Sequence, residues 1–477
     1  MSARVFGAVD IGASGGRVMA GVLEGGQIRL ETVHRFPNGV TRRDGHLRWD
    51  VTGLFQQVLT GLALLADRHP QVESIGIDTW AVDYGLLDEQ GTLLGEPISY
   101  RDGRTADAVH RVDLTVAPRT QFDVNGLQRL PFTTLFQLEA EKSSPLWERA
   151  RTVVLLPDLL SFWLTGQLAA ERTNASTTGL VDVRTGRWST GLMSQLGLPP
   201  ERFPRLDDPG TIRGRVLPEI VSVTGLPQAC VVTAVGSHDT ASAVVGVPAA
   251  SMSFAYVSSG TWSLAGLELG APVLSSAAFE ANFTNEGGVD RTVRFLRNVG
   301  GLWLLQESLR DWQASGVPVG AQDVLAAAEA LPAGGPRIDV DDPGLIAPGD
   351  MPRRINDAVS AMGEAALESP PAVVRCILDS LAAAYAETTS QAARLADRDV
   401  DVIHIVGGGS RNKLLCQLTA DLSGVRVVAG PVEATAIGNL LVQARTHGAA
   451  PSSLPEMRAM LAGSVRDELR EYAPGGG

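Results

Sequence analysis

The stretch Ala8-Val9-Asp10-Ile11-Gly12-Ala13-Ser14-Gly15-Gly16-Arg17-Val18 (residues 8–18) decides the fold of this chain. Apolar residues on both sides of a Gly/Ser turn predict a buried strand over 4–10 and its hairpin partner over 17–23. Glycines let a backbone approach a bound group closely, and successive N–H groups in such a turn form a nest for anions. The stretch therefore predicts a strand–turn–strand unit that holds a phosphate. The open alternative is an ordinary hairpin whose glycines only satisfy turn geometry.

Three side chains of this segment have candidate roles. Ser14 adds a hydroxyl, and Arg17 offers a planar fork of donors to a transferred phosphoryl group. Asp10, at the end of the predicted strand, is placed to hold Mg²⁺ through water. The spacing is not that of a Walker loop, because no Gly-Lys-Ser/Thr is present, and no Gly-x-Gly-x-x-Gly opens a helix here.

A second hairpin is predicted in the middle of the chain. Residues 253–257 are apolar, residues 262–269 alternate, and Ser258-Ser259-Gly260-Thr261 forms the turn between them. Thr261 offers a hydroxyl and an N–H to nucleotide phosphates, with a plain turn as the alternative. Two equivalent hairpins suggest a duplicated domain facing itself across a cleft, although the repeat is weak in sequence.

A run of three glycines, Gly407-Gly408-Gly409, separates a predicted strand over 401–406 from a helix marked by Leu414, Leu418 and Leu422. Junctions of this kind are ligand sites in α/β folds. The flat run therefore predicts a surface for an adenine or a ribose, and a purely structural role is the alternative.

The tripeptide His238-Asp239-Thr240 follows a predicted strand over 231–235. Phosphoryl transfer needs positioning, charge neutralisation and a carboxylate that takes the hydroxyl proton. Asp239 at a strand end suits that role. The alternative is an N-cap aspartate for a helix over 240–247, and both roles can hold at once.

A tryptophan between carboxylates ends another predicted strand, over 74–78, in Asp78-Thr79-Trp80-Ala81-Val82-Asp83. A sugar has an apolar face and a hydroxylated edge, so this pattern suits a sugar site. The alternative is a core tryptophan. Asn298 and Gln306 are polar residues in an otherwise apolar stretch, and alone they mean little.

Bulk properties narrow the class. At 477 residues the chain predicts two or three domains, and 44% apolar with 19% charged residues predicts a globular protein. A formal charge of −13 without any basic run argues against nucleic acid. A phosphate site then relies on backbone N–H groups, isolated arginines and a metal ion.

The remaining signals concern compartment and helices. The three cysteines form no Cys-x-x-Cys pair and predict buried reduced thiols. No signal peptide is visible and no apolar run approaches the ~20 residues of a membrane span, so we expect a cytoplasmic protein without membrane contact. Apolar spacing predicts helices over 54–66, 157–164 and 374–396, and residues 331–354 predict an irregular loop.

In this order the segments resemble the FGGY carbohydrate kinases, from Asp10 to about Gln443. The triple-glycine stretch is typical of the family at large, and DTWAVDYGLLD, TNASTT, HDT and FLRNVGGLWLLQE are typical of a narrower branch. The stretches that carry the resemblance are AVDIGASGGRVM (8–19), SIGIDTWAVDYGLLD (74–88), YRDGRT (100–105), RTNASTTGLVDVRTGRWS (172–189), VGSHDTASAV (235–244), SSGTWSLAG (258–266), NFTNEGG (282–288), RFLRNVGGLWLLQES (294–308) and VGGGSRNKLLCQLTADLSGVRVVAGPVEATAIGN (406–439).

The resemblance implies an α/β chain with a ribonuclease-H-like, actin/hexokinase-type ATPase fold. Its two similar lobes would be residues 1–244, on the sugar and phosphate side, and 245–477, on the nucleotide side, with a ligand cleft between them. It implies ATP and Mg²⁺ as cofactors and phosphorylation of L-rhamnulose at O1. ATP and the sugar would be the partners of a monomer or small homo-oligomer.

Carried over position by position, the resemblance also assigns residues. Asp239 would be the proton acceptor. The ATP-binding set would be Ala13, Ser14, Gly15, Gly16, Arg17, Thr261, Gln306 and Gly408. The sugar-binding set would be Ala81, His238, Asp239, Thr240 and Asn298. The family pattern has Gly where Ala81 stands and Ser where Gly15 stands, so the methyl of Ala81 can trim the sugar pocket.

Three other functions compete with this prediction. One is another ketose kinase of the same family, acting on fuculose, xylulose or a linear signalling sugar. Another is an actin-like ATP-gated sensor without sugar chemistry, against which Asp239 argues, because a binding module needs no base there. A sugar-responsive repressor is disfavoured because no basic helix-turn-helix precedes Val5.

Overall fold

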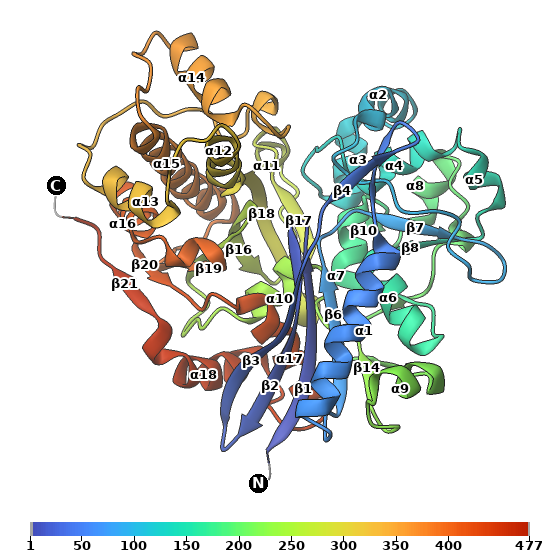
Figure 1. The fold of residues 1–477 in the computed structure, drawn as a ribbon. Helices are drawn as coiled ribbons and strands as arrows, with labels where there is room; N and C mark the ends of the chain where they lie inside the picture. The colour runs from blue at the N-terminus through green and yellow to red at the C-terminus, as the bar shows by residue number, and fades with distance from the viewer. Residues whose placement is uncertain (1–2, 476–477) are drawn as a thin grey trace. The chain divides into compact units, whose positions relative to one another are not determined.

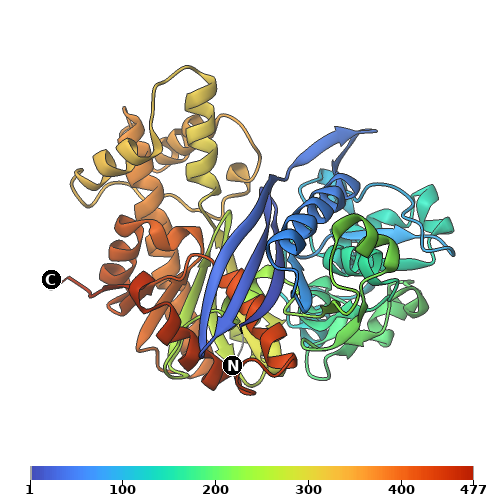
Figure 2. The same ribbon diagram turned by 60° about the horizontal axis from the view of Figure 1, so that its bottom comes forward.

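The computed structural model describes residues 3–475, which divide by compactness into two units (Figures 1 and 2). Unit 1 contains the chain up to Ser251 together with Glu268–Phe295 and Ala434–Arg466. Unit 2 contains Met252–Leu267, Leu296–Glu433 and the chain from Asp467 onward. Unit 1 therefore takes segments from both sides of residue 244, whereas unit 2 begins only at Met252, and the division into lobes at residue 244 stays a prediction.

Unit 1 is built on a six-stranded sheet of order β13-β14-β6-β1-β2-β3. Its strands are β1 (Arg4–Gly12), β2 (Gly15–Glu24), β3 (Gln27–Pro37), β6 (Ser74–Thr79), β13 (Ile212–Arg215) and β14 (Val231–Thr233). Strand β1 pairs antiparallel with β2 and parallel with β6, and β6 pairs parallel with β14. The predicted opening hairpin and the strand over 74–78 are confirmed, and the strand predicted over 231–235 ends at Thr233.

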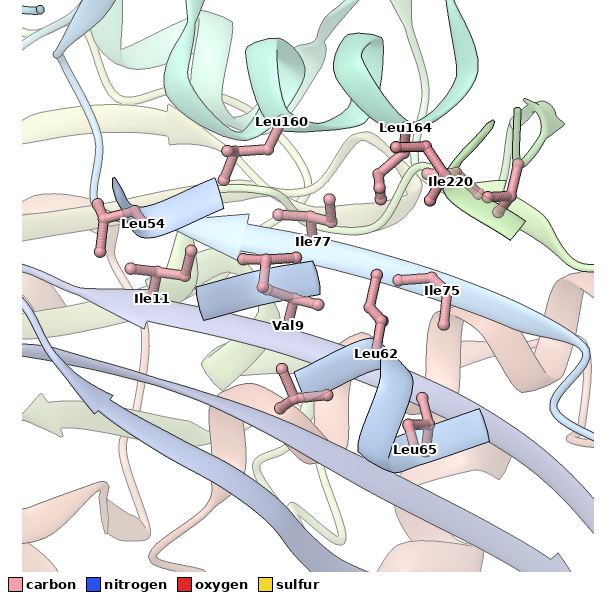
Figure 3. Close-up of a cluster of buried hydrophobic side chains, with 14 of the residues drawn as sticks. Val9, Ile11, Leu54, Leu62, Leu65, Ile75, Ile77, Leu160, Leu164 and Ile220 are labelled. Atoms are coloured by element: carbon pink, nitrogen blue, oxygen red, sulfur yellow. The ribbon is translucent and has the colours of Figure 1, made fainter. Parts of the chain in front are cut away.

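The core of unit 1 lies between this sheet and helices α1 (Val51–Arg68), α6 (Leu156–Thr165) and α9 (Pro218–Thr224) (Figure 3). The predicted apolar stripe of α1 is buried, with Leu54, Val58, Leu62 and Leu65 at most 6% exposed. Pro157 lies in the first turn of α6, and Gly166 ends that helix at φ +68°, as the sequence predicted.

Two helices of small residues, α10 (Asp239–Val245) and α17 (Ala434–Thr446), also pack together in unit 1. A Cβ built on Gly438 would lie 1.8 Å from the backbone oxygen of Ser242, and one on Gly246 would lie 2.2 Å from that of Ala434. The helix backbones can therefore meet only because neither position has a side chain. This contact fixes α10, the helix that begins at Asp239.

The second sheet has the order β17-β18-β16-β15-β19-β20-β21. Its strands are β15 (Phe254–Ser259), β16 (Trp262–Leu269), β17 (Thr284–Gly287), β18 (Val293–Gly300), β19 (Val402–Val406), β20 (Arg426–Ala429) and β21 (Arg470–Tyr472). Strand β15 pairs antiparallel with β16 and parallel with β19, which repeats the pairing of β1 with β2 and β6. The predicted second hairpin is therefore confirmed.

Helices of unit 2 follow the prediction with one correction. The helices predicted over 374–396 and after the glycine run are α15 (Pro370–Ala396) and α16 (Lys413–Ser423). The loop predicted over 331–354 is interrupted, because α14 (Met351–Ala361) already begins at Met351. Prolines favour a loop in this stretch, but Pro352 lies in the first turn of α14, where proline is well tolerated.

The expectations about cysteines and membrane spans can be compared with the described residues. Cys230, Cys376 and Cys416 are buried free thiols, as predicted. Burial raises the pKa of Cys230 and of Cys416 to about 12, so both stay protonated near neutral pH. Within residues 3–475, no helix combines the length and apolar character needed to cross a membrane.

Replacing Gly438 by alanine is expected to destabilise the protein by about 1–3 kcal/mol, because the added methyl overpacks the contact between α10 and α17. The matched control is Gly191→Ala in α8 (Thr190–Gln195), where a Cβ meets no atom within 4 Å. Chemical denaturation of both variants measures the effect. Equal free energies of unfolding for Gly438→Ala and wild type would contradict the close-contact argument.

Candidate active site

Carboxylates gather where β1 and β6 end. Asp10 and Asp78 are neighbours in the parallel register, and the next pair joins Ile11 with Thr79. Asp78 is fully buried, and Asn439 donates to its Oδ2 at 2.6 Å. Burial, with the nearby charges of Asp10 and Asp239, raises the pKa of Asp78 well above its usual range. This edge therefore carries one carboxyl group that favours its protonated form.

Asp10 and Arg17 are partners across the first hairpin. They are opposite each other in the antiparallel register, and Arg17 donates to Asp10 Oδ2 from Nε at 3.0 Å and from Nη2 at 2.7 Å. The sequence predicts separate roles for these side chains, Asp10 with a metal and Arg17 with a phosphoryl group. In the structure, the charges of Asp10 and Arg17 instead balance each other at the start of the glycine turn. The role of each residue stays a prediction.

Asp239 begins α10, and His238 is the residue at the N-cap position, so the N-cap alternative for Asp239 is wrong by one residue. Thr240 Oγ1 donates to Asp239 Oδ1 at 3.1 Å, and His238 Nε2 lies 3.3 Å from the same oxygen. The Asp239 side chain keeps 31% of its surface exposed. Burial raises its pKa, His238 opposes that shift, and Asp10 adds to it. A carboxylate with a raised pKa is a better proton acceptor.

Both ring nitrogens of His238 have neighbours, Asp239 at Nε2 and two further side chains at Nδ1. Its side chain is 7% exposed, with Nδ1 3.0 Å from Arg294 Nη2 and 3.3 Å from Glu286 Oε2. Glu286 and Arg294 form an ion pair at 3.1 Å. The sequence assigned neither of them a role, although both lie in stretches that carried the family resemblance. Neither residue stands out in the sequence, because Glu286 lies in the polar strand TNEG and Arg294 shares its strand with Arg297 and Asn298.

The loop before His238 is fixed by another residue that sequence reasoning missed, Glu171. It is fully buried, and its Oε2 accepts from the backbone N–H of Ser237 at 3.0 Å and from Ser237 Oγ at 2.7 Å. Thr173 Oγ1 donates to the same oxygen at 2.6 Å. The carboxylate of Glu171 therefore holds the residue that precedes His238.

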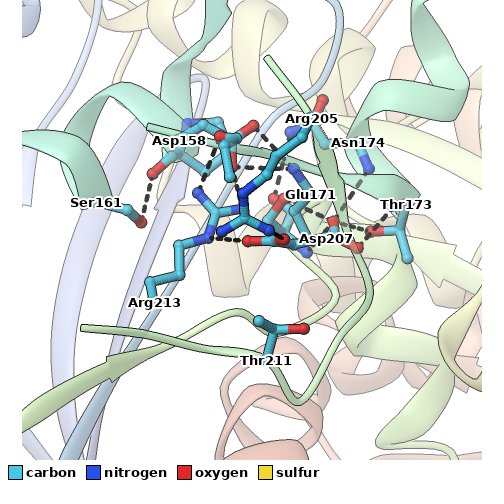
Figure 4. Close-up of polar contacts among 12 residues, drawn as sticks. Asp158, Ser161, Glu171, Thr173, Asn174, Arg205, Asp207, Thr211 and Arg213 are labelled. Carbon is cyan, nitrogen blue, oxygen red and sulfur yellow. Dashed lines mark hydrogen bonds and ion pairs between the residues drawn. The ribbon is translucent and has the colours of Figure 1, made fainter. Parts of the chain in front are cut away.

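A buried ion network supports Glu171 (Figure 4). Asp158 accepts the Glu171 backbone N–H at 3.1 Å and pairs with Arg213 at 2.8 Å. Arg213 also lies 3.6 Å from Asp207, and Figure 4 shows its guanidinium between the two carboxylates. Burial raises the pKa of Asp158 to about 6, although Arg213 opposes the shift. Removing one partner of such a buried pair typically costs about 3–5 kcal/mol.

Trp80 is a core residue, as the alternative to a sugar contact proposed. It is 7% exposed, packs 4.4 Å from Trp49 between ring centroids, and donates from Nε1 to Asp83 Oδ2 at 3.0 Å. Asp83 is buried and also accepts from Trp49 Nε1 at 2.6 Å and from Gln137 Nε2 at 3.0 Å. This network fixes the ends of the segment that contains Ala81.

Ala81 lies in a strained turn. The Asp83 N–H donates to the Ala81 carbonyl at 2.9 Å, and the residue between them, Val82, has φ +67°. Positive φ is unfavourable for a β-branched residue, and such strain persists only where the surroundings enforce it. Thr134 Oγ1 holds the Val82 carbonyl at 2.7 Å. Ala81 itself is half-buried, which is compatible with the predicted sugar contact.

In unit 2, the turn at Thr261 joins two other predicted segments. The N–H of Trp303 donates to the Thr261 carbonyl at 3.1 Å, at the start of α12 (Trp303–Ala314), which carries Gln306. On the other side, a Cβ on Gly407 would lie 2.9 Å from the Ser259 carbonyl oxygen. The candidate ATP residues Thr261, Gln306 and Gly408 are therefore on three adjoining segments of one unit.

The three glycines differ in what surrounds them. Gly407 has φ +81°, and a Cβ on Gly409 would lie 2.1 Å from Ser259 Oγ, so both positions are closed to side chains. Gly408 is exposed, and its Cβ would meet only the Ser259 carbonyl oxygen at 4.0 Å. The structural role falls on Gly407 and Gly409, and Gly408 is open toward solvent for a ligand.

A buried hydroxyl cluster supports the same turn. Tyr385 of α15 contacts Ser259 Oγ at 3.0 Å and Ser263 Oγ at 2.5 Å through its phenol oxygen. Burial raises the pKa of Tyr385 to about 12, which keeps the phenol protonated. Ser259 and Ser263 are register partners on either side of Thr261. Tyr385 therefore links α15 to both strands next to this turn and fixes the turn.

The acidic edge, formed by Asp10 and Asp78 where β1 and β6 end, suits Mg²⁺ only together with phosphates. Among residues 3–475, Asp78 Oδ1 is buried beside Asp10 without a hydrogen-bond partner, and a cation bound there would favour the ionised form of both carboxyl groups. Within residues 3–475, however, no three His, Cys, Asp or Glu side chains are grouped to hold a metal by themselves. Mg²⁺ is commonly bound by one or two carboxylates with substrate phosphates and water. The residues therefore fit a metal that arrives with a nucleotide.

Comparison with known proteins shows the family to which this chain belongs. Models for the N-terminal and C-terminal domains of the FGGY family of carbohydrate kinases match residues 5–246 and 255–447. The chain belongs to the FGGY family of carbohydrate kinases, and it is therefore a kinase. This confirms the family resemblance that the sequence predicted.

Two curated relatives cover nearly the whole chain. A rhamnulokinase of Enterococcus faecalis is 42% identical over 99% of this chain and 95% of its own length. A rhamnulokinase of Bacteroides thetaiotaomicron is 40% identical over 98% of this chain and 96% of its own length.

Solved structures share the fold at low sequence identity. A gluconate kinase from Lactobacillus acidophilus matches with a TM-score of 0.80 at 15% identity, over 99% of this chain and 94% of that chain. A glycerol kinase from Plasmodium falciparum with ADP matches with a TM-score of 0.75 at 16% identity, over 96% of this chain and 92% of that chain. The predicted α/β fold of the actin/hexokinase-like type is confirmed.

The predicted site residues thus fall into two sets. Asp10, Ala13–Arg17, Ala81 and His238–Thr240 belong to unit 1, and Thr261, Asn298, Gln306 and Gly408 belong to unit 2. Within unit 1, strand pairing brings Asp10, Asp78 and the turn before Asp239 to one sheet edge. Within unit 2, Thr261 links the segments of Gln306 and Gly408. The role of each residue stays a prediction.

Gly408→Val is expected to weaken ATP binding by at least about 10-fold, because the valine side chain fills the open face of the glycine run. The variant is expected to fold, because a Cβ at this position meets only the Ser259 carbonyl oxygen, at 4.0 Å. The matched control is Gly335→Val, also in unit 2, where a Cβ meets no atom within 4 Å. Calorimetric titration with a non-hydrolysable ATP analogue measures the affinity. Unchanged affinity in a folded Gly408→Val protein would assign the whole run to the strand–helix junction.

Proposed function

We propose that this chain transfers the γ-phosphoryl group of ATP to O1 of L-rhamnulose, giving L-rhamnulose 1-phosphate and ADP, as a step of L-rhamnose breakdown. The observation that carries the proposal is Asp239 at the start of α10, with its carboxylate oriented by His238 and Thr240 beside the acidic edge. Two rhamnulokinases that match nearly the full chain support the choice of sugar.

Asp239 accepts the proton of the O1 hydroxyl as the sugar oxygen attacks the γ-phosphorus in line. Arg17 and the backbone N–H groups of residues 13–17 stabilise the charge of the moving phosphoryl group. Asp10 would hold, through water, a Mg²⁺ ion that arrives with ATP, and such an ion would supply charge neutralisation at the phosphates. Thr261, Gln306 and Gly408 bind the rest of the nucleotide, and Ala81, His238, Thr240 and Asn298 orient the sugar.

A coupled ADP-release assay over ketopentoses and 6-deoxyketohexoses tests the proposal. The expected result is the highest kcat/KM with L-rhamnulose and a product that carries its phosphate on O1 by NMR. A higher kcat/KM with fuculose or xylulose would favour another ketose kinase of the family. ATP binding without ADP release on any sugar would favour the sensor. A cytoplasmic location and a monomer or small homo-oligomer stay predictions.

Asp239→Asn is expected to lower kcat by about 10²–10⁴-fold while ATP still binds, because the amide cannot take the hydroxyl proton. Steady-state kinetics and calorimetry with ATP measure the two effects separately. The control is Asp350→Asn, which changes a carboxylate that is 71% exposed and lies in unit 2. Near-wild-type kcat in Asp239→Asn would remove this carboxylate from the mechanism.

Ala81→Gly is expected to change the ratio of kcat/KM for L-rhamnulose to that for other ketoses by up to ~10-fold, with the KM for ATP little changed. One methyl in a pocket changes discrimination by roughly 1–3 kcal/mol at most. The direction depends on whether the methyl crowds the sugar or packs against its deoxy end. Constant sugar ratios with altered ATP kinetics would contradict the placement of Ala81 against the sugar.

A further inference from the structure

The buried arginine behind His238 has no part in the reaction described above. Arg294, in β18, is 0% exposed, and its Nε donates to the Gly287 carbonyl at 2.9 Å. Its Nη2 lies 3.1 Å from Glu286 Oε2 and 3.0 Å from His238 Nδ1. Buried charges are kept where they are paired, so Glu286 balances Arg294. Burial opposes ionisation of Glu286, but the charge of Arg294 helps to bring its pKa below the usual range.

The chemistry of the guanidinium decides where His238 carries its proton. Arginine has five N–H donors, no acceptor and no accessible neutral form. A hydrogen bond between Arg294 Nη2 and His238 Nδ1 at 3.0 Å therefore requires a lone pair on Nδ1. Glu286 Oε2 is 3.3 Å from Nδ1, but it has no hydrogen-bond partner within the described residues 3–475. The ring is then neutral, with its proton on Nε2.

That proton faces the proposed base. His238 Nε2 lies 3.3 Å from Asp239 Oδ1, and Thr240 Oγ1 donates to the same oxygen at 3.1 Å. Catalytic hydrogen bonds are often long before substrate binds and tighten in the complex. Two donors on Oδ1 fix the plane of the carboxylate and leave the other oxygen, Oδ2, as the more basic one.

We propose that Arg294 and Glu286 are positioning residues that hold His238 in its Nε2–H form, so that Asp239 takes the substrate proton on Oδ2. For the reaction this rests on the proposed function. The proton of the sugar O1 hydroxyl moves to Oδ2, the O1–phosphorus bond forms, and the bond from phosphorus to the bridging oxygen of ADP breaks. The protonation of His238 itself is a property of the protein without substrate.

NMR of the full-length protein with ¹⁵N-labelled histidine tests the proton position at pH 7.5. The chain has seven histidines, and the spectrum of His238→Gln assigns the signals of His238. The expected wild-type signals are a protonated Nε2 and an unprotonated Nδ1. A wild-type ring with its proton on Nδ1, or on both nitrogens, would overturn the proposal.

Two substitutions separate the roles of the ion pair. Arg294→Met removes the donor, so Nδ1 is expected to become protonated and to donate to Glu286. Glu286→Gln keeps Arg294 and is expected to retain the Nε2–H form. If Nδ1–H donated to Glu286 in the native protein, Glu286→Gln would change the His238 signals and Arg294→Met would not. That pattern overturns the assignment, and Glu286→Gln keeps the test available where Arg294→Met fails to fold.

Kinetics then test the effect on Asp239. Arg294→Met is expected to lower kcat about 10- to 100-fold with the KM for ATP changed less than about twofold, and Arg294→Lys is expected to restore part of kcat. The matched control is Arg375→Met, which removes a buried arginine paired with Asp379 at 2.9 Å in unit 2 and is expected to leave the His238 signals unchanged.

An unchanged kcat in folded Arg294→Met would overturn the positioning role. If wild-type protein released no ADP with any ketose of the panel, the proposed function would fail instead. In that event the His238 spectra would still decide whether Arg294 fixes the ring.

Discussion

The parallel pairing of β1 with β6 places Asp10 beside Asp78, and much of unit 1 is arranged around these two neighbouring carboxyl groups. Two neighbouring carboxyl groups cannot both ionise in a buried setting without a large cost in free energy. The protein meets this constraint in two ways. Arg17 neutralises Asp10 through two hydrogen bonds, and Asp78 accepts from Asn439 while its own pKa is raised. The edge can therefore present negative charge to a cation without losing the strand pairing beneath it.

Buried carboxylates with nearby partners also occur around the candidate base, Asp239. Glu171, which fixes Ser237, and Asp83, which fixes the turn at Ala81, are buried carboxylates that accept several hydrogen bonds. Glu286 is a buried carboxylate that balances the charge of Arg294 next to His238. A hydrogen bond to a charged group contributes roughly 1.5–3 kcal/mol, and leaving such a group unpaired costs more. These residues are therefore expensive to change, although none of them is placed at the reacting atoms. They provide the rigid support that a proton acceptor needs for its orientation.

The sequence predicted the strands and helices better than the buried side-chain contacts that support Asp239. Strand alternation, helical spacing and glycine turns are local signals, and they predicted both hairpins, α1 and α15. Contacts such as Glu171 with Ser237 or Arg294 with His238 join residues 66 and 56 positions apart, and no local sequence pattern connects residues so far apart. Trp80 shows the same limit, because its partners Trp49 and Asp83 are set by tertiary packing. The role of Asp239 needed the family resemblance as well as its place after a strand.

The two sheets show how one framework carries different chemistry. Counted from its turn, the third pair of the first hairpin is Asp10 with Arg17, and the third pair of the second is Val257 with Ala265. The parallel neighbours at these positions are Asp78 in one sheet and Ile405 in the other. At these equivalent positions, the first sheet therefore carries charged side chains and the second carries apolar ones. The second offers hydroxyls, backbone groups and an exposed glycine, which suit the uncharged parts of a nucleotide. Because side chains at a strand end can change without disturbing the pairing below, a duplicated fold can keep its architecture while only one copy retains the acidic residues.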